Sequence, residues 1–154
     1  MANIAQPYVN YCLDCAKCCV THPCALEPED LGKIANYLNL PEDELFARFL
    51  VLDYVESEGG KQYYVCPARK GDVTGTVVDR NWTFSDSACI FLHNGRCSIQ
   101  QVKPKGGRTY YCSLLTNTGH VAVGYDKKVS ANDWSGSPGL RRLLAVTVEN
   151  KQHG

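Results

Sequence analysis

Residues 12–19 read Cys-Leu-Asp-Cys-Ala-Lys-Cys-Cys, a C-x-x-C-x-x-C-C run that contains Cys12, Cys15, Cys18 and Cys19. Two residues between cysteines allow a tight turn to aim both sulfurs at one ion about 2.3 Å away. The alternative is burial as small apolar side chains, because unligated cysteine is among the most buried residue types. Four cysteines in so short a stretch favour metal ligation, so we expect an irregular loop organised by its ligands.

Composition limits the classes of protein that this chain can belong to. It has nine cysteines among 154 residues, an odd number that disulfides cannot pair completely. The first residues lack the basic and apolar stretches of a secretory signal, so we expect a cytoplasmic protein whose thiols stay reduced. Lys+Arg and Asp+Glu number 16 each, and no apolar run reaches the ~18 residues of a membrane span. We therefore expect neither nucleic acid nor a membrane as a partner.

Apolar periodicity and turn residues predict a small α+β fold. Two helices are expected at about 28–38 and 41–53, because each range opens with proline and acidic residues and continues with apolar residues at helical spacing. Strands are expected at 61–65, 75–78, 82–84 and 120–125, and a C-terminal helix at 139–148. Asn94-Gly95 predicts a tight hairpin turn, since both residues tolerate positive φ. These short antiparallel strands, the two N-terminal helices and the cysteine-rich loops predict one domain over residues 1–154.

Two later cysteines, Cys89 and Cys97, flank the turn at Asn94. In an ideal two-residue hairpin Leu92 would oppose Cys97, and Cys89 would fall on the other face because side chains alternate. Both sulfurs can serve one centre only if the chain bends or turns helical just after Cys97. Residues 98–102 can form such a turn before Pro104 stops it.

The first cysteine run leaves the choice of metal open. Three cysteines at this interval match the start of a ferredoxin-type iron–sulfur run, in which the next ligand comes three residues later and precedes proline. Here that position holds His22, followed by Pro23. Imidazole suits zinc and iron alike, so His22 is a further candidate ligand. We expect Cys24 to be buried, because it directly precedes an apolar helix.

Together with the motifs that follow it, the first run identifies a family resemblance. These motifs are Pro28-Glu29-Asp30-Leu31, Cys89-Ile90-Phe91-Leu92 and Gly95-Arg96-Cys97-Ser98-Ile99 with Lys103-Pro104. The chain resembles the CxxCxxCC cysteine-cluster family, proposed to chelate zinc or iron, over about residues 8–112. The resemblance implies metal chelation by the cysteines. Relatives occur as standalone proteins and inside a flagellin lysine methylase, so it implies no particular reaction.

Two positions depart from the family pattern. Gly107 stands where a cysteine beside an arginine is expected, and Gln100 replaces a tyrosine. Cys112, or else the more distant Cys66, is the candidate to supply the missing donor; otherwise the site is under-ligated. The candidate metal ligands are Cys12, Cys15, Cys18, Cys19, Cys66, Cys89, Cys97 and Cys112.

The functional expectation is a metal-binding protein that holds an iron–sulfur cluster or zinc. Lys103, Lys105 and Arg108 are interpreted as compensation for thiolate charge, since four thiolates around one Zn²⁺ leave a net charge of −2. Two alternatives stay open at this point. One is a redox or modification enzyme, or its accessory, that uses an iron centre. The other is a zinc-stabilised module that binds a protein partner. Whichever function holds, we expect residues 113–154 to form a C-terminal extension packed on the metal-binding part.

Overall fold

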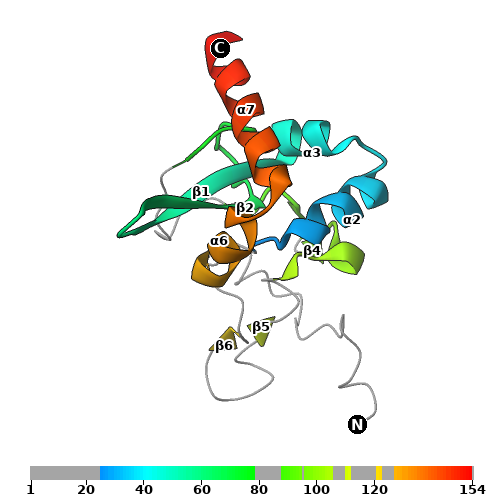
Figure 1. The fold of residues 1–154 in the computed structure, drawn as a ribbon. Coiled ribbons are helices and arrows are strands. Elements are labelled where there is room, and N and C mark those ends of the chain that lie inside the picture. Colours follow the sequence, from blue (N-terminus) through cyan, green and yellow to red (C-terminus); the bar gives the residue numbers. More distant parts are fainter. Residues whose placement is uncertain are drawn as a thin grey trace.

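The fold is seen in a computed structural model, which describes residues 25–78, 88–94, 96–105, 110–111, 121–122 and 127–153. Figure 1 shows the arrangement of its helices and strands. In chain order the described elements are α2 (Pro28–Leu38), α3 (Glu42–Phe49), β1 (Leu50–Ser57), β2 (Gly60–Pro67), β3 (Leu92–His93), β4 (Arg96–Cys97), the 3₁₀ turn η2 (Gln100–Val102), β5 (Tyr110–Tyr111), β6 (Val121–Ala122), α6 (Lys127–Ser135) and α7 (Pro138–His153). These elements make an α+β fold.

Helix α2 coincides with the range expected from the sequence, and its start explains why. Pro28 occupies the first turn, where its missing N–H removes no helical hydrogen bond. The Asp30 carboxylate accepts a hydrogen bond from the Glu27 N–H at 3.0 Å, which satisfies a donor at the helix start. The helix ends at Asn39, whose φ of 60° is the left-handed conformation typical of this position. Helix α2 buries its apolar face in the core through Leu31 and Ile34.

The C-terminal end predicted for the second helix is wrong. Helix α3 stops at Phe49, and Leu50 begins strand β1 instead of continuing the helix to residue 53. An apolar run such as Phe49–Leu52 suits either a helix or a buried strand. The strand is formed because β1 pairs along its whole length with β2, from Leu50 opposite Pro67 to Ser57 opposite Gly60. The strand expected at 61–65 lies within β2 and is confirmed.

Two further segments extend the β1–β2 hairpin near its base, on opposite sides. Along β2, the Leu26 N–H donates to the Val65 carbonyl oxygen at 2.9 Å. Along β1, the Leu52 N–H donates to the Thr76 carbonyl at 3.0 Å, and Val77 forms a parallel bridge with Leu52. The expected strand at 75–78 is therefore a short parallel segment beside β1. The expected strand at 82–84 lies outside the described residues.

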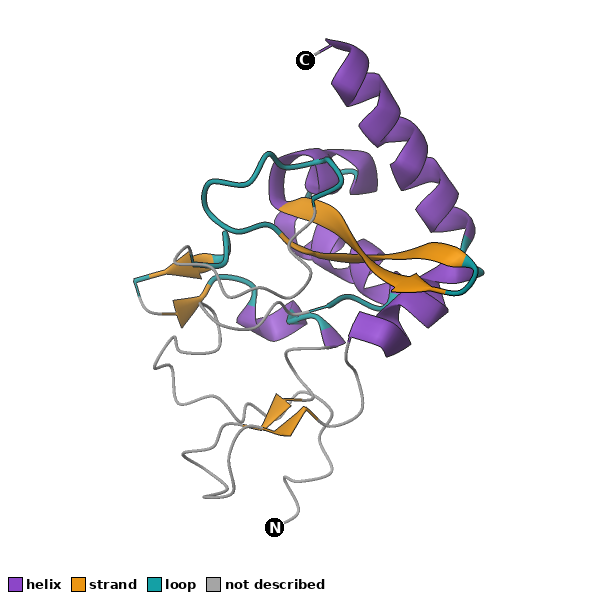
Figure 2. Ribbon diagram, turned by 90° about the vertical axis from the view of Figure 1, so that its left-hand side faces the viewer, coloured by secondary structure: helices purple, strands orange, loops and turns teal. Residues whose placement is uncertain are grey.

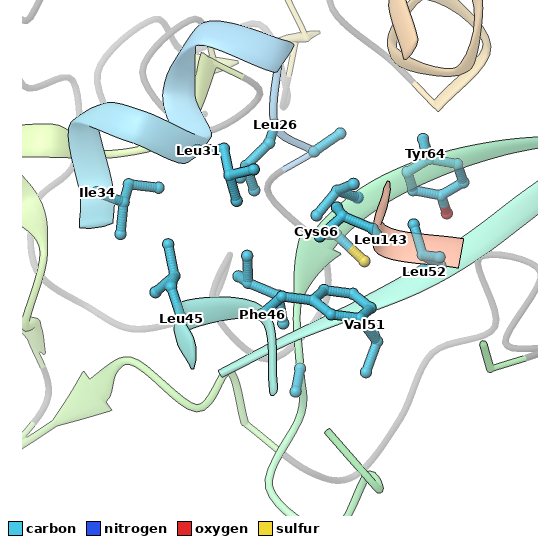
Figure 3. Packing of buried hydrophobic residues seen from close by; sticks show 14 of the residues in the cluster. Leu26, Leu31, Ile34, Leu45, Phe46, Val51, Leu52, Tyr64, Cys66 and Leu143 are labelled. Atoms are coloured by element: carbon cyan, nitrogen blue, oxygen red, sulfur yellow. The ribbon is translucent and has the colours of Figure 1, made fainter. Parts of the chain in front are cut away.

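The C-terminal part adds two helices to the core. Helix α7 contains the expected helix at 139–148 but is longer, while α6 was not expected. Helix α6 packs on both strands of the long hairpin and buries Ala131 and Trp134, and α7 buries Leu143. Figure 2 shows the long hairpin with helices against it, and Figure 3 shows Leu143 within the same apolar cluster as the side chains of α2 and α3.

Two small antiparallel hairpins complete the described strands. In the first, β3 pairs with β4 through a turn in which Asn94 has a φ of 51°, as its Asn-Gly sequence predicts. In the second, β5 pairs with β6, which lies inside the strand expected at 120–125. Throughout the described part of the chain, every helix is too short or too polar to cross a membrane.

Candidate metal centre

The structure describes three of the eight candidate ligands, Cys66, Cys89 and Cys97. The other five lie outside the described residues, namely Cys12, Cys15, Cys18, Cys19 and Cys112, as do Cys24, His22, Gly107 and Arg108. The structure therefore defines the surroundings of Cys66, Cys89 and Cys97. It also shows how the segments next to the other candidate ligands are attached to the core.

Cys66 lies in the apolar core. It sits on β2 opposite Val51, is 0% exposed and belongs to the main cluster of buried side chains. Figure 3 shows its sulfur within that cluster. A fully buried thiol in apolar surroundings packs as a small hydrophobe. Its location favours a packing role, and its role as a ligand stays a prediction.

Cys89 lies at the edge of the core, beside the end of β2. It is partly buried and forms an antiparallel bridge with Arg69, which is only 4% exposed. Side chains alternate along an extended segment, so Cys66 and Arg69, three residues apart, point to opposite faces. A bridged pair presents its two side chains on one face, so alternation predicts that Cys89 lies on the face of Arg69 and away from Cys66.

Cys97 lies opposite Leu92 in the small hairpin, in the register that the sequence predicts. A bend between Cys89 and Cys97 is present, but it lies before the hairpin and not after Cys97. The Leu92 N–H donates to the Cys89 carbonyl at 3.0 Å, so residues 89–92 form a turn instead of a straight ladder. The turn holds Cα atoms 89 and 92 within about 7 Å, and the strand pair holds 92 and 97 within about 5.5 Å.

These two limits together keep the Cα atoms of Cys89 and Cys97 within about 12.5 Å of each other. The expected turn after Cys97 is also present as η2, where the Val102 N–H donates to the Ile99 carbonyl at 2.9 Å. Both cysteines are partly buried against the core. Thiolates that share one metal ion each lie about 2.3 Å from it, a closer approach than this limit requires, so a shared centre at Cys89 and Cys97 stays a prediction.

The segment that follows Cys97 is tied to the start of α2. The Lys105 N–H donates to the buried Asp30 carboxylate at 2.8 Å, and the Lys105 ammonium group lies 3.5 Å from the Glu27 carboxylate. Lys105, expected to offset thiolate charge, thus has a carboxylate partner in the structure. The contact joins residues just after the first cysteine run to the segment between Cys97 and Cys112.

Leu26, two residues after Cys24, is held by three buried hydrogen bonds. Its N–H donates to Val65, as described above, and its carbonyl oxygen accepts from the Ser130 hydroxyl and the Trp134 indole N–H, each at 2.8 Å. The two side-chain donors, Ser130 and Trp134, both belong to α6. The C-terminal helices therefore fix the point at which the first cysteine-rich segment enters the core.

The described residues supply only part of a complete metal site. Among them, no group of three or more His, Cys, Asp or Glu side chains is close enough to hold one ion. Cys89 and Cys97 offer two thiol donors, which suit zinc and iron. The donor chemistry therefore fits either metal, and a site that uses these two cysteines takes its remaining donors from other segments of the chain.

The chain is thus a thiol-rich protein with an α+β fold. Comparison with known families identifies the family to which it belongs. A family model named CxxCxxCC matches residues 11–122 and is described as a "putative zinc- or iron-chelating domain". The chain belongs to this family. No curated protein and no solved structure matched the chain.

Sequence reasoning missed Arg69, whose backbone lies beside that of Cys89, and it missed Ser130 and Trp134, which hold Leu26 in place. The sequence did offer a sign of Arg69, because this charged residue directly follows the run Tyr64–Ala68, which is buried in the structure. Ser130 and Trp134 carried none, because their partner, the Leu26 carbonyl, lies more than a hundred positions earlier in the chain.

Proposed function

We propose that this protein chelates zinc or iron, the latter as an iron–sulfur cluster, through cysteine thiolates. The observation that carries this proposal is the family match over residues 11–122, which spans the C-x-x-C-x-x-C-C run and the later cysteines. The ligands that we propose are Cys12, Cys15, Cys18, Cys19, Cys89, Cys97 and Cys112. Cys66 belongs to the set expected from the sequence, but its burial in the apolar core favours packing.

The chain's own residues prepare the donors in two ways. The turn at residues 89–92 and the small hairpin hold the backbone at Cys89 and Cys97, so little chain entropy remains to be lost there on binding. Leu26 and Asp30 tie the neighbouring segments to the core. When bound, zinc would supply a structural cross-link and an iron–sulfur cluster would supply electron transfer. A reducing compartment such as the cytoplasm keeps the thiols available.

A matched pair of variants tests the proposal. We expect Cys15→Ser to lose most of the bound metal and much of the stability, because binding free energy in small metal sites is folding free energy. We expect Cys66→Ala to keep its metal and to lose about 1 kcal/mol of stability, the effect of removing one buried group of methylene size. Elemental analysis after anaerobic purification and urea unfolding measure the two quantities.

Each outcome of this comparison has a distinct meaning. Equal metal loss in both variants would place Cys66 among the ligands and contradict its packing role. Full metal content in Cys15→Ser would contradict the proposed role of the first cysteine run.

A further inference from the structure

Arg69 is a buried charge close to a candidate ligand. It is 4% exposed, so water screens its charge less than it screens a charge at the surface. It was absent from the basic residues that the sequence indicated near the cysteines. Its position beside Cys89 suggests that Arg69 affects the thiolate of that residue.

The backbone fixes Arg69 directly beside Cys89. The Lys70 N–H donates to the Ala88 carbonyl at 2.8 Å, and the Ile90 N–H donates to the Ala68 carbonyl at 2.9 Å. These two bonds flank the Arg69–Cys89 bridge on either side. They make it a non-hydrogen-bonded antiparallel pair, the type with a Cα separation of about 4.5 Å and the closer side chains. Both side chains therefore leave the backbone on the same face, next to each other.

A second set of bonds holds the backbone of Arg69 from the other direction. The Arg69 N–H donates to the Asp72 carboxylate at 2.7 Å, and the Asp72 N–H donates to the Arg69 carbonyl at 2.9 Å. Asp72 thus closes a turn directly after the bridge. The backbone of Arg69 is thus held on both sides, and its buried side chain starts from a fixed position next to that of Cys89.

We propose that Arg69 is a positioning residue that acts through Cys89, offsetting the negative charge of the metal-bound Cys89 thiolate. This inference rests on the proposed function, since it requires Cys89 to be a ligand. Thiolate centres carry excess negative charge, and residues around the ligands stabilise it by charge and by hydrogen bonds to sulfur. Arginine suits the task because its guanidinium stays charged when buried and presents five N–H donors.

The test is zinc affinity, measured by competition with a chelator in the full chain. We expect Arg69→Gln to weaken zinc binding by about 10–100-fold, the usual effect of losing a residue that supports a metal ligand. Arg69→Lys keeps the charge and should recover a large part of the affinity. Arg142→Gln is the charge-matched control: Arg142 is half exposed and pairs with Glu42 at 2.6 Å, and we expect no change there.

Two further measurements separate this role from general support of the fold. Thr74→Val removes the 2.7 Å hydrogen bond from Thr74 to the Ala47 carbonyl, which weakens the same loop without a change of charge. In the cobalt(II)-substituted protein, Arg69→Gln should shift the sulfur-to-cobalt charge-transfer band, whereas Thr74→Val should leave it in place. In a Cys89→Ser background, Arg69→Gln should have little further effect on affinity, because the pair acts as one unit.

Unchanged zinc affinity in Arg69→Gln would overturn the inference, as would an equal loss of affinity in Thr74→Val or full additivity with Cys89→Ser. If the wild-type chain binds zinc but the variants give any of these overturning results, the proposed function stands and only the role of Arg69 is wrong. If the wild-type chain binds neither zinc nor iron, the proposed function fails and the inference fails with it.

Discussion

A chain cut after residue 122, which keeps the whole family match, is expected not to fold. The cut removes α6 and α7, which bury Ala131, Trp134 and Leu143 in the same core as α2 and the long hairpin. A buried tryptophan removes about 150–250 Å² from water. At about 25 cal/mol per Å² of apolar surface, Trp134 alone contributes about 4–6 kcal/mol.

That contribution is large against the total stability of a domain this size, about 5–15 kcal/mol. The cut also leaves the buried Leu26 carbonyl without the Ser130 and Trp134 donors, and an unsatisfied buried acceptor costs about 1–3 kcal/mol. Circular dichroism and urea unfolding, with metal present throughout, measure the result. A cut after Thr147 is the control, because it keeps the side chains that the structure places in the core. Cooperative unfolding of residues 1–122 at the full-length midpoint would contradict the prediction.

Asp30→Ala is expected to lower stability by about 3–6 kcal/mol. The Asp30 side chain is 1% exposed and accepts hydrogen bonds from the N–H groups of Glu27 and Lys105. Hydrogen bonds to a charged group contribute about 1.5–3 kcal/mol each, and both donors would lose their acceptor. Asp30→Asn keeps one acceptor oxygen and should lose less. Urea unfolding gives the free energies.

Glu29→Ala is the matched control for Asp30. Glu29 lies in the same first turn of α2 but is exposed, so its loss should change stability by no more than about 0.5 kcal/mol. Hydrogen exchange adds a local measurement, since the Lys105 amide should lose protection in Asp30→Ala and keep it in Glu29→Ala. Equal effects of the two substitutions would show that Asp30 serves only the helix dipole and does not join the two segments.

Local signals in the sequence were sufficient for some elements. Helix α2 could be predicted because Pro28 and Asp30 specify its start, and the small hairpin because Asn94-Gly95 specifies its turn. The opposition of Leu92 and Cys97 followed from the alternation of side chains alone. These features depend on residues within a few positions of each other.

Elements that depend on distant partners could not be predicted in the same way. The boundary between α3 and β1 was missed because pairing with β2, not local periodicity, decides the conformation of Leu50–Asp53. Helix α6 was missed because its buried side chains include Ser130, which is polar and finds its acceptor only when Leu26 is in place. Propensity is a weak prior where tertiary contacts decide.

For the candidate site, sequence spacing selects thiols that can bind metal but does not show which of them lie together. Cys66 and Cys89 both fit the chemistry, yet Cys66 is buried in the core on β2, whereas Cys89 is partly buried and bridges to Arg69 beyond the end of β2. That separation depends on the register of β2 with its neighbours, which no local motif specifies.

X-ray absorption at the zinc and iron edges of the anaerobically purified chain identifies the atoms bound to the metal, and it therefore tests chelation by cysteine thiolates. We expect zinc or iron with mainly sulfur neighbours at about 2.3 Å, as in thiolate sites. A shell of oxygen and nitrogen alone, or protein that contains neither metal, would contradict it.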